Sequence, residues 1–280
     1  MRIDKLLAAN GIPRKEMKKA LKEGWVLVED RPATSLAQNV DTRIQQVLYK
    51  GKRLHGAAHR YYMLNKPIGV VTANADPRFM TVFDCLTSSN TMQRKAEDLE
   101  DLNQVHGVET VSDRSQEKLG IETGGVIDPA GLYAIGRLDR DTSGLLIITD
   151  NGPLGFQLLH PDRHVTKSYE VCVNGPLDQS AVAAFAAGIV FRGGEVAKPA
   201  ELEILTSGER ESWARVTITE GKRHQVKKMF LAVGVKVVAL KRLAFGDFVL
   251  DPDLAEGYFR ALNEEELKIV AKYLDLSREA

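Results

Sequence analysis

The most informative hydrophobic pattern of this chain is the continuous apolar run Leu145–Ile148, in which two of the four residues are β-branched. A short, continuous apolar run of this kind predicts a β-strand that is covered on both faces. The Asp-Asn-Gly sequence at 150–152 has turn chemistry and closes the strand. The preceding segment, 136–144, holds charged and small residues. It predicts a loop anchored to a rigid strand, where functional side chains often stand.

Residues 1–55 show two helical patterns followed by strand patterns. The first pattern predicts a helix that begins near Ile3 and ends at Asn10-Gly11. The second predicts a helix that begins near Pro13 and buries Met17 and Ala20. A strand over 25–28 and a turn over 29–32 follow. The opposite arc of the second helix, at about 100° per residue, is almost purely cationic and carries Arg14, Lys15, Lys18, Lys19 and Lys22.

The rest of the chain predicts more strands than helices. After a polar, basic connector over 50–60, a strand and turn are expected over 61–71. Further strands are expected at 166–173, 202–206, 213–219 and 235–240. Helices are expected at 180–189, 223–233 and 263–274, the last with Asn263 as its N-terminal cap. Many strands with few interposed helices favour an α+β fold with a mixed, largely antiparallel sheet.

Composition narrows the class of protein. The chain has 280 residues, of which 44% are hydrophobic and 27% charged, as in a globular protein with one large domain or two unequal ones. No apolar run approaches the roughly 20 residues that a membrane helix needs, and the N-terminus lacks a secretory pattern. Cys85 and Cys172 make no disulfide framework, so we expect a cytoplasmic location and no membrane partner. His160 and His164 are separated by Pro161, and no metal site is expected there.

The formal net charge of zero hides a segregation of charge along the chain. Residues 1–60 hold thirteen Lys and Arg against six Asp and Glu, whereas residues 81–130 hold four against ten. The single-signed N-terminal face therefore favours binding to nucleic acid over mere solubility. The acidic stretch at about 88–128 lacks aromatic residues and predicts a long insertion. Its charge argues against phosphate contact, and we interpret it as a passive surface insertion.

Three separated segments carry candidate chemistry. The first is the loop with Arg137 and Asp139. The second is the strand in which Lys167 and Tyr169 share one face by two-residue alternation. The third is the start of the basic helix near 223–233, where Gly221 precedes Arg223, His224, Gln225 and Lys227. Each alone is more often structural: a loop Asp is usually a cap or ion-pair residue, a strand Tyr is usually packing, and a basic helix is usually solvated.

Their order and spacing resemble one family. The run Gly-Arg-Leu-Asp-x-x-Thr-x-Gly-Leu-Leu at 136–146 is similar to the motif of RNA pseudouridine synthases of the small-subunit rRNA type, and the match covers about residues 60–262. The resemblance implies isomerisation of uridine to pseudouridine, with extrusion of the base from the stack and no cofactor. Asp139 matches the nucleophile, Tyr169 the active-site aromatic, and Lys227 the basic partner of the carboxylate. Arg137 matches the residue thought to fill the gap left by the flipped base.

The resemblance also implies a domain division and a partner. Residues 1–59 are similar to the S4 RNA-binding module, and residues 60–280 would form the synthase domain. Lys167, Arg223, His224 and Gln225 would bind substrate. The string His-Gln-Val-Lys at 224–227 is similar to that of the 16S rRNA enzyme and favours 16S rRNA as the substrate. Free RNA and a subunit assembly intermediate both stay open as the substrate state, and we expect a monomeric enzyme. The alternatives left open are a 23S rRNA synthase and a non-catalytic ribosome-assembly factor. A DNA-binding regulator lacks a clear recognition helix.

Overall fold

The computed structural model describes residues 1–56, 58–87 and 127–275. The chain divides into two compact units. The first unit comprises Met1–Tyr61, Thr149–Arg163 and Leu262–Ala280, and the second comprises Tyr62–Ile148 and His164–Ala261. The expected division between residues 59 and 60 stays a prediction. The expected insertion over 88–128 lies almost entirely outside the described residues.

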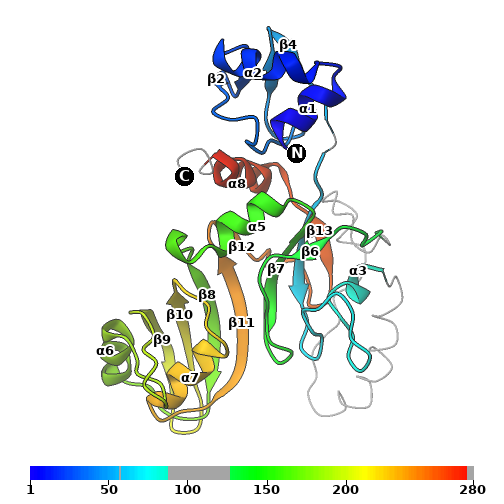
Figure 1. Cartoon of the computed structure of the whole chain (residues 1–280). Coiled ribbons are helices and arrows are strands. Elements are labelled where there is room, and N and C mark those ends of the chain that lie inside the picture. Colours follow the sequence, from blue (N-terminus) through cyan, green and yellow to red (C-terminus); the bar gives the residue numbers. More distant parts are fainter. Residues whose placement is uncertain (57, 88–126, 276–280) are drawn as a thin grey trace. The chain divides into compact units, whose positions relative to one another are not determined.

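The N-terminal part of the first unit holds two helices and a small sheet (Figure 1). The helices are α1 (Ile3–Ala9) and α2 (Arg14–Lys22), as the sequence predicted. The sheet is antiparallel and has the order β2-β1-β3-β4. Its strands are β1 (Val26–Val28), β2 (Arg31–Pro32), β3 (Val47–Tyr49) and β4 (Lys52–Arg53).

The expectation of a plain connector over 50–60 was wrong at its start. Lys50 and Gly51 both have positive φ, 48° and 77°, and make a tight turn. This turn reverses the chain, so that β4 pairs with β3.

The rest of the first unit is helical. The helix α5 (Gly152–Leu159) was not predicted, because the Asp-Asn-Gly sequence was interpreted as a turn. The side chain of Asn151 instead accepts a hydrogen bond from the Leu154 N–H at 3.3 Å and caps this helix. A short 3-10 turn, η4 (Pro161–Arg163), follows.

The C-terminal helix α8 (Glu264–Asp275) begins as expected after Asn263. The Asn263 side chain accepts a hydrogen bond from the Glu266 N–H at 2.9 Å. The Glu266 carboxylate accepts one from the Asn263 N–H in return, at 2.8 Å, which completes a capping box.

The second unit is built on a nine-stranded sheet, which confirms the expected α+β class. Its main path is β13-β5-β7-β11-β8-β10-β9, with β12 paired to β11 and β6 to β7. The sheet is mixed, because β11 runs parallel to β7 but antiparallel to β8. The strands are β5 (Tyr61–Lys66), β6 (Tyr133–Ala134), β7 (Ser143–Thr149), β8 (Lys167–Val173), β9 (Glu201–Ser207), β10 (Ser212–Ile218), β11 (Val237–Phe245), β12 (Phe248–Val249) and β13 (Phe259–Ala261).

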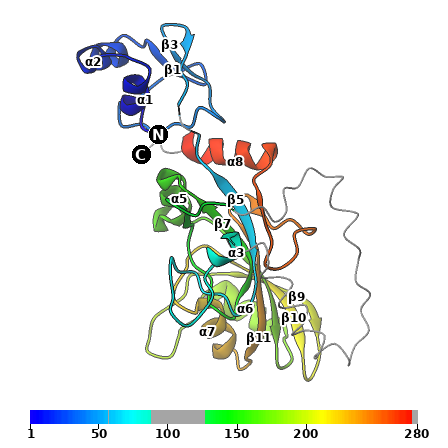
Figure 2. The same ribbon diagram turned by 90° about the vertical axis from the view of Figure 1, so that its right-hand side faces the viewer.

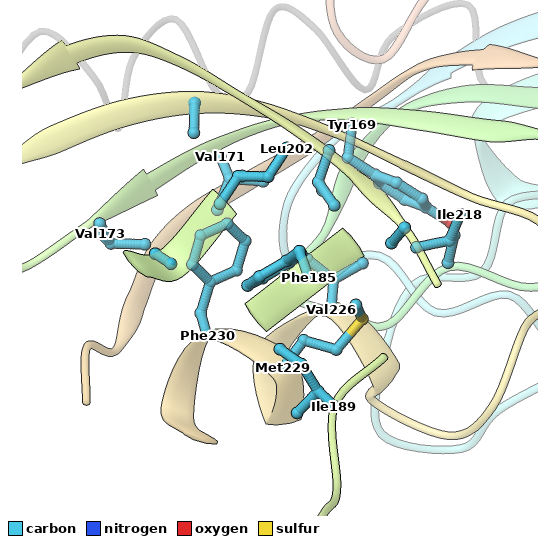
Figure 3. Packing of buried hydrophobic residues seen from close by; sticks show 14 of the residues in the cluster. Tyr169, Val171, Val173, Phe185, Ile189, Leu202, Ile218, Val226, Met229 and Phe230 are labelled. Atoms are coloured by element: carbon cyan, nitrogen blue, oxygen red, sulfur yellow. The ribbon is translucent and has the colours of Figure 1, made fainter. Parts of the chain in front are cut away.

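Two helices cover one face of the β8–β10 part of this sheet, α6 (Gln179–Ala187) and α7 (Gln225–Ala232) (Figures 1 and 2). A further short helix, α3 (Asp84–Thr87), lies in the same unit. The apolar cluster between sheet and helices includes Phe185 and Phe230, whose ring centroids are 4.9 Å apart (Figure 3). Tyr169 and Ile218 lie together within this cluster (Figure 3). The cluster therefore fixes α7 against β8 and β10.

Candidate active site

All three segments singled out in the sequence belong to the second unit, and one apolar cluster joins them. Leu138, which directly precedes Asp139, is buried in the same cluster as Tyr169 of β8. Val226, which directly precedes Lys227 in α7, is buried there too. Burial of these neighbours brings the loop, the strand and the helix together.

The loop that carries Asp139 is held along its length by the segment 66–72. The Lys66 ammonium donates to the Thr142 carbonyl oxygen at 2.8 Å, and the Gly69 N–H donates to the Arg140 carbonyl oxygen at 2.8 Å. The Thr72 hydroxyl accepts from the Leu138 N–H at 3.2 Å and donates to the Leu138 carbonyl oxygen at 3.0 Å. These bonds fix the backbone on both sides of Asp139.

Asp139 faces two basic groups from the start of α7. The Lys227 Nζ lies 3.2 Å from Asp139 Oδ2, which is the ion pair that the resemblance implied. The His224 Nε2 lies 3.6 Å from Asp139 Oδ1. His224 occupies the N-cap position of α7 in the left-handed conformation, with φ 54°, and its side chain makes no capping hydrogen bond. Its ring thus approaches Asp139 and does not cap the helix.

Lys227 also binds a second carboxylate, that of Asp141, by a short hydrogen bond. Burial acts to raise the pKa of Asp141, but the hydrogen bond and charge of Lys227 outweigh it and lower that pKa below its ordinary value. The side chains are only partly screened from water: 35% of Asp139 and 25% of Lys227 is exposed. Lys227 therefore stands between two carboxylates at the rim of the site.

Tyr169 is 8% exposed and pairs in register with Arg242 of β11, which is 2% exposed. The Arg242 Nε donates to the Leu145 carbonyl oxygen at 2.8 Å, and its guanidinium interacts with the Tyr169 side chain. Burial lowers the pKa of the Arg242 guanidinium, whereas Tyr169 acts to raise it. The Nη2 atom of Arg242 is buried without a hydrogen-bond partner in the described part of the chain. The buried guanidinium of Arg242 thus lies next to Tyr169, the candidate aromatic residue of the site.

The remaining candidate residues differ in their exposure to solvent and in their hydrogen bonds. The Lys167 Nζ donates to the Val165 carbonyl oxygen at 2.9 Å, and burial lowers its pKa to about 8. Arg137 and Arg223 are exposed. Gln225 is buried, and its amide is already occupied: it accepts from the Lys222 N–H at 2.9 Å and donates to Glu220 Oε1 at 2.8 Å. Gln225 therefore braces the loop that leads into α7.

The five basic residues predicted on α2 are all exposed, as expected. One of them has a partner that the sequence pattern did not show. The Lys19 Nζ lies 5.4 Å from the Trp25 ring centroid, on a ring that the Lys50 Nζ also approaches, at 4.2 Å. Glu16 binds Lys50 at 2.7 Å. The cationic face of α2 thus retains its charge, because this acidic residue is paired elsewhere.

Sequence reasoning missed Lys66, Asp141 and Arg242. Lys66 and Arg242 are charged residues in strands that are mostly apolar, β5 and β11, and both are nearly inaccessible to water. A lysine or arginine in such a strand is a signal, because buried charges occur only where they are paired or hydrogen-bonded. Asp141 gave no such signal, since it looks like an ordinary loop residue.

Comparison with known proteins identifies the class. A family model described as RNA pseudouridylate synthase matches residues 60–232. An uncharacterized RNA pseudouridine synthase of Bacillus subtilis is 37% identical over 271 residues, which is 96% of this chain and 98% of that protein. The ribosomal small subunit pseudouridine synthase A of Escherichia coli is 33% identical over 275 residues, 96% of this chain and 100% of that protein. A crystal structure of a pseudouridylate synthase has a TM-score of 0.57 at 30% identity, covering 96% of this chain and 99% of that one.

This chain therefore belongs to the RNA pseudouridylate synthase family, and it is a pseudouridine synthase that acts on RNA. Within the described residues, no group of three or more His, Cys, Asp and Glu side chains is placed to hold a metal ion. None of the described helices has the length and apolar character needed to cross a membrane.

Proposed function

We propose that this enzyme converts a specific uridine of 16S rRNA to pseudouridine, with Asp139 as the nucleophile. The observation that carries the proposal is the setting of Asp139. Its backbone is held rigidly by the segment 66–72, and its carboxylate faces Lys227 and His224. Both basic groups lie within ion-pair distance of the carboxylate, and a carboxylate is able to act as a nucleophile without a separate base.

The reaction is an isomerisation, so atoms balance without a co-reactant. The bond between N1 of uracil and C1′ of ribose breaks, and the base rejoins through C5. The C5 proton is lost and N1 gains one. Asp139 would add to an electrophilic carbon of the nucleotide, either C1′ or C6, and would leave when the new bond has formed. Because these atoms lie inside a stacked RNA segment, the nucleotide must first be extruded.

Further residues have proposed roles around the extruded nucleotide. Tyr169 would lie against the uracil ring and assist proton transfer, with Arg242 holding its hydroxyl end. Arg137, which is exposed two residues before Asp139, would occupy the space that the base leaves. Arg223 and Lys167 would contact the RNA backbone near the start of α7 and β8.

The choice of 16S rRNA rests on relatives. The full-length relatives of Escherichia coli and Haemophilus influenzae, 33% and 32% identical, are named as ribosomal small subunit pseudouridine synthases. The sequence His-Gln-Val-Lys at 224–227 supports the same substrate. A 23S rRNA target and a non-catalytic assembly factor make different predictions, which the following experiment separates.

The test is to map pseudouridines in both rRNAs from cells that lack this protein, complemented with wild type, Asp139→Asn or Asp162→Asn. Asp162 is an exposed aspartate of η4, with 89% of its side chain accessible, and serves as the matched control. We expect one 16S pseudouridine to be restored by wild type and Asp162→Asn but not by Asp139→Asn. If the restored pseudouridine lay in 23S rRNA, the substrate would be 23S rRNA and not 16S rRNA. If Asp139→Asn restored the pseudouridine, Asp139 would be excluded as the nucleophile. If cells that lack the protein kept every rRNA pseudouridine, the non-catalytic assembly factor would be favoured.

A further inference from the structure

A second cluster of charge lies beside the Asp139 loop. Arg140 directly follows Asp139, and its guanidinium carbon lies 4.4 Å from the centroid of the Phe79 ring. The guanidinium carbon of Arg78 lies 5.7 Å from the same centroid. Two cations from separate segments thus share one aromatic ring. Arginine planes stack on aromatic rings in this way because the ring face is electron-rich.

The cluster is built to hold its shape. The Asp76 carboxylate accepts hydrogen bonds from the backbone N–H groups of Arg78 at 2.8 Å and Phe79 at 3.0 Å. These bonds, that from Arg78 first, lower the pKa of Asp76, so this carboxylate stays ionised. On the other side, the Arg140 carbonyl oxygen is bound by the Gly69 N–H at 2.8 Å. Both segments are therefore fixed before any ligand arrives.

The two arginines form no ion pair within the described part of the chain. Both are exposed, and neither lies within ion-pair distance of a described carboxylate, although Asp76 is near enough to attract Arg78 through space. Other arginines of this protein do have such partners: Arg215 binds Glu203 at 3.1 Å, and Arg260 binds Asp251 at 2.7 Å. These two guanidinium groups face solvent beside the candidate active site. In an enzyme that modifies RNA, such groups are suited to bind the anionic RNA backbone.

We propose that Arg78, Phe79 and Arg140 form a binding subsite for the RNA backbone phosphates that flank the nucleotide converted at Asp139. This inference rests on the proposed role of Asp139. Extrusion of a nucleotide requires the neighbouring backbone to be held, and phosphate contacts set the position of a nucleic acid on a protein. Phe79 has no charge of its own to offer the RNA; it holds both guanidinium groups in place.

The test measures RNA affinity and turnover separately, with an unmodified 16S rRNA transcript as the probe and a 23S transcript in parallel. The variants are Arg78→Gln, Arg140→Gln, Arg140→Lys and Phe79→Leu. The control is Arg210→Gln, an exposed arginine in the turn between β9 and β10, at the opposite end of β10 from the loop that leads into α7. Dissociation constants are measured at several KCl concentrations, and single-turnover rates at saturating RNA.

We expect each arginine variant to bind RNA about tenfold more weakly than wild type and to reduce the slope of log affinity against log salt by about 0.7 to 0.9. Phe79→Leu keeps both charges and should weaken binding with the slope unchanged, because only the fixed positions of the charges are affected. Arg140→Lys should likewise keep the slope, since the charge remains. Arg210→Gln should match wild type in both quantities.

If Arg78→Gln and Arg140→Gln bind with the affinity and slope of Arg210→Gln, the subsite is wrong, even when the wild type forms pseudouridine. A phenylalanine variant that binds as tightly as wild type would overturn the role of Phe79. If the wild type forms no pseudouridine in either transcript or in ribosomal subunit assembly intermediates, the proposed function fails instead. The salt slopes then still decide whether these two arginines contact RNA phosphates.

Discussion

The backbone of Arg242 lies where the side chain of any larger residue at position 144 would begin. A Cβ atom on Gly144 would stand 2.2 Å from the Arg242 carbonyl oxygen and 2.6 Å from its nitrogen. Gly144 and Arg242 are register partners in the parallel pair β7 and β11. Gly144 also has φ +103°, a conformation that other residues rarely adopt. The glycine of the motif therefore has a steric role: it lets β11 approach the strand that supports the Asp139 loop.

Gly144→Ala should destabilise the enzyme severely. The clash is with backbone atoms, which cannot move aside as the end of a flexible side chain can. Backbone strain and overpacking each cost about 1–3 kcal/mol, so we expect the free energy of unfolding to fall by about 2–5 kcal/mol in a denaturant titration. Gly152→Ala is the matched control, because a Cβ there meets nothing within 4 Å. Equal stability of the two variants would contradict this account.

Local patterns predicted most of the elements but misjudged some boundaries. The apolar run Leu145–Ile148 identified β7, and its burial on both faces is confirmed. The helix α5 was missed because Asn151 supports a turn and a helix cap with the same side-chain oxygen. The turn and the helix are distinguished only by the residues that follow Asn151, because their apolar side chains are buried in the folded protein when the segment is helical.

The part of the candidate site that could be predicted came from the family motif and not from local hydrophobic patterns. The pairing of Asp139 with Lys227 follows from the family motif and is present in the structure. The approach of His224 to Asp139 and of Arg242 to Tyr169 depends on how α7 and β11 pack, and no local periodicity encodes it. The support of the loop by Lys66 likewise joins segments that are 76 residues apart in sequence.

Lys66 should make the stability of the enzyme depend on pH in the alkaline range. Burial lowers its pKa from the ordinary 10.5 to about 8, so the folded state disfavours the charged form. Below pH 8 the folded protein bears this penalty, and above 10.5 neither state is charged. Stability should therefore rise between these two values, where the unfolded chain binds more protons. Lys167, with a pKa also lowered to about 8, should contribute in the same direction.

Replacement of Lys66 by Met should flatten part of that rise in urea titrations across the same alkaline range. Near neutral pH two effects of this replacement oppose each other: the Thr142 carbonyl loses its donor, which costs about 1–3 kcal/mol, whereas the burial penalty of the charged amine is removed. The exposed Lys236 supplies the control Lys236→Met, which should leave the profile unchanged. An identical profile for Lys66→Met and wild type would show that the buried amine is not the source.

The cationic face of α2 should contribute to RNA affinity without affecting turnover. Lys15, Lys18 and Lys22 are exposed, and none forms an ion pair with a described carboxylate. Their combined replacement by Gln should reduce the salt slope of rRNA binding by about 0.7 to 0.9 for each phosphate that is no longer neutralised. The rate at saturating RNA should stay at the wild-type value. Lys268→Gln, at an exposed lysine paired with Glu265, is the control. An unchanged slope would mean that this face is merely solvated.

Lys227 should support the ionised state of the Asp141 carboxylate. With Lys227→Met, burial is no longer opposed by the lysine, so the pKa of Asp141 should rise, which carboxyl NMR titration would measure. Because 35% of Asp139 is exposed, we expect a smaller effect on turnover than for a fully buried pair, about tenfold to a hundredfold. Lys227→Arg keeps the charge and should retain most activity.

The neighbouring lysine distinguishes a specific effect of Lys227 from a general reduction of charge on α7. Lys228 points away from Asp139, and its Nζ lies 5.4 Å from the Phe191 ring centroid. Lys228→Met removes the same charge one position along the helix, yet should leave turnover at saturating RNA and the pKa of Asp141 unchanged. Residues one apart on a helix face about 100° away from each other, so only one of the two is able to reach the loop. If Lys228→Met slowed turnover and Lys227→Met did not, the contact between α7 and Asp139 would be assigned to the wrong lysine.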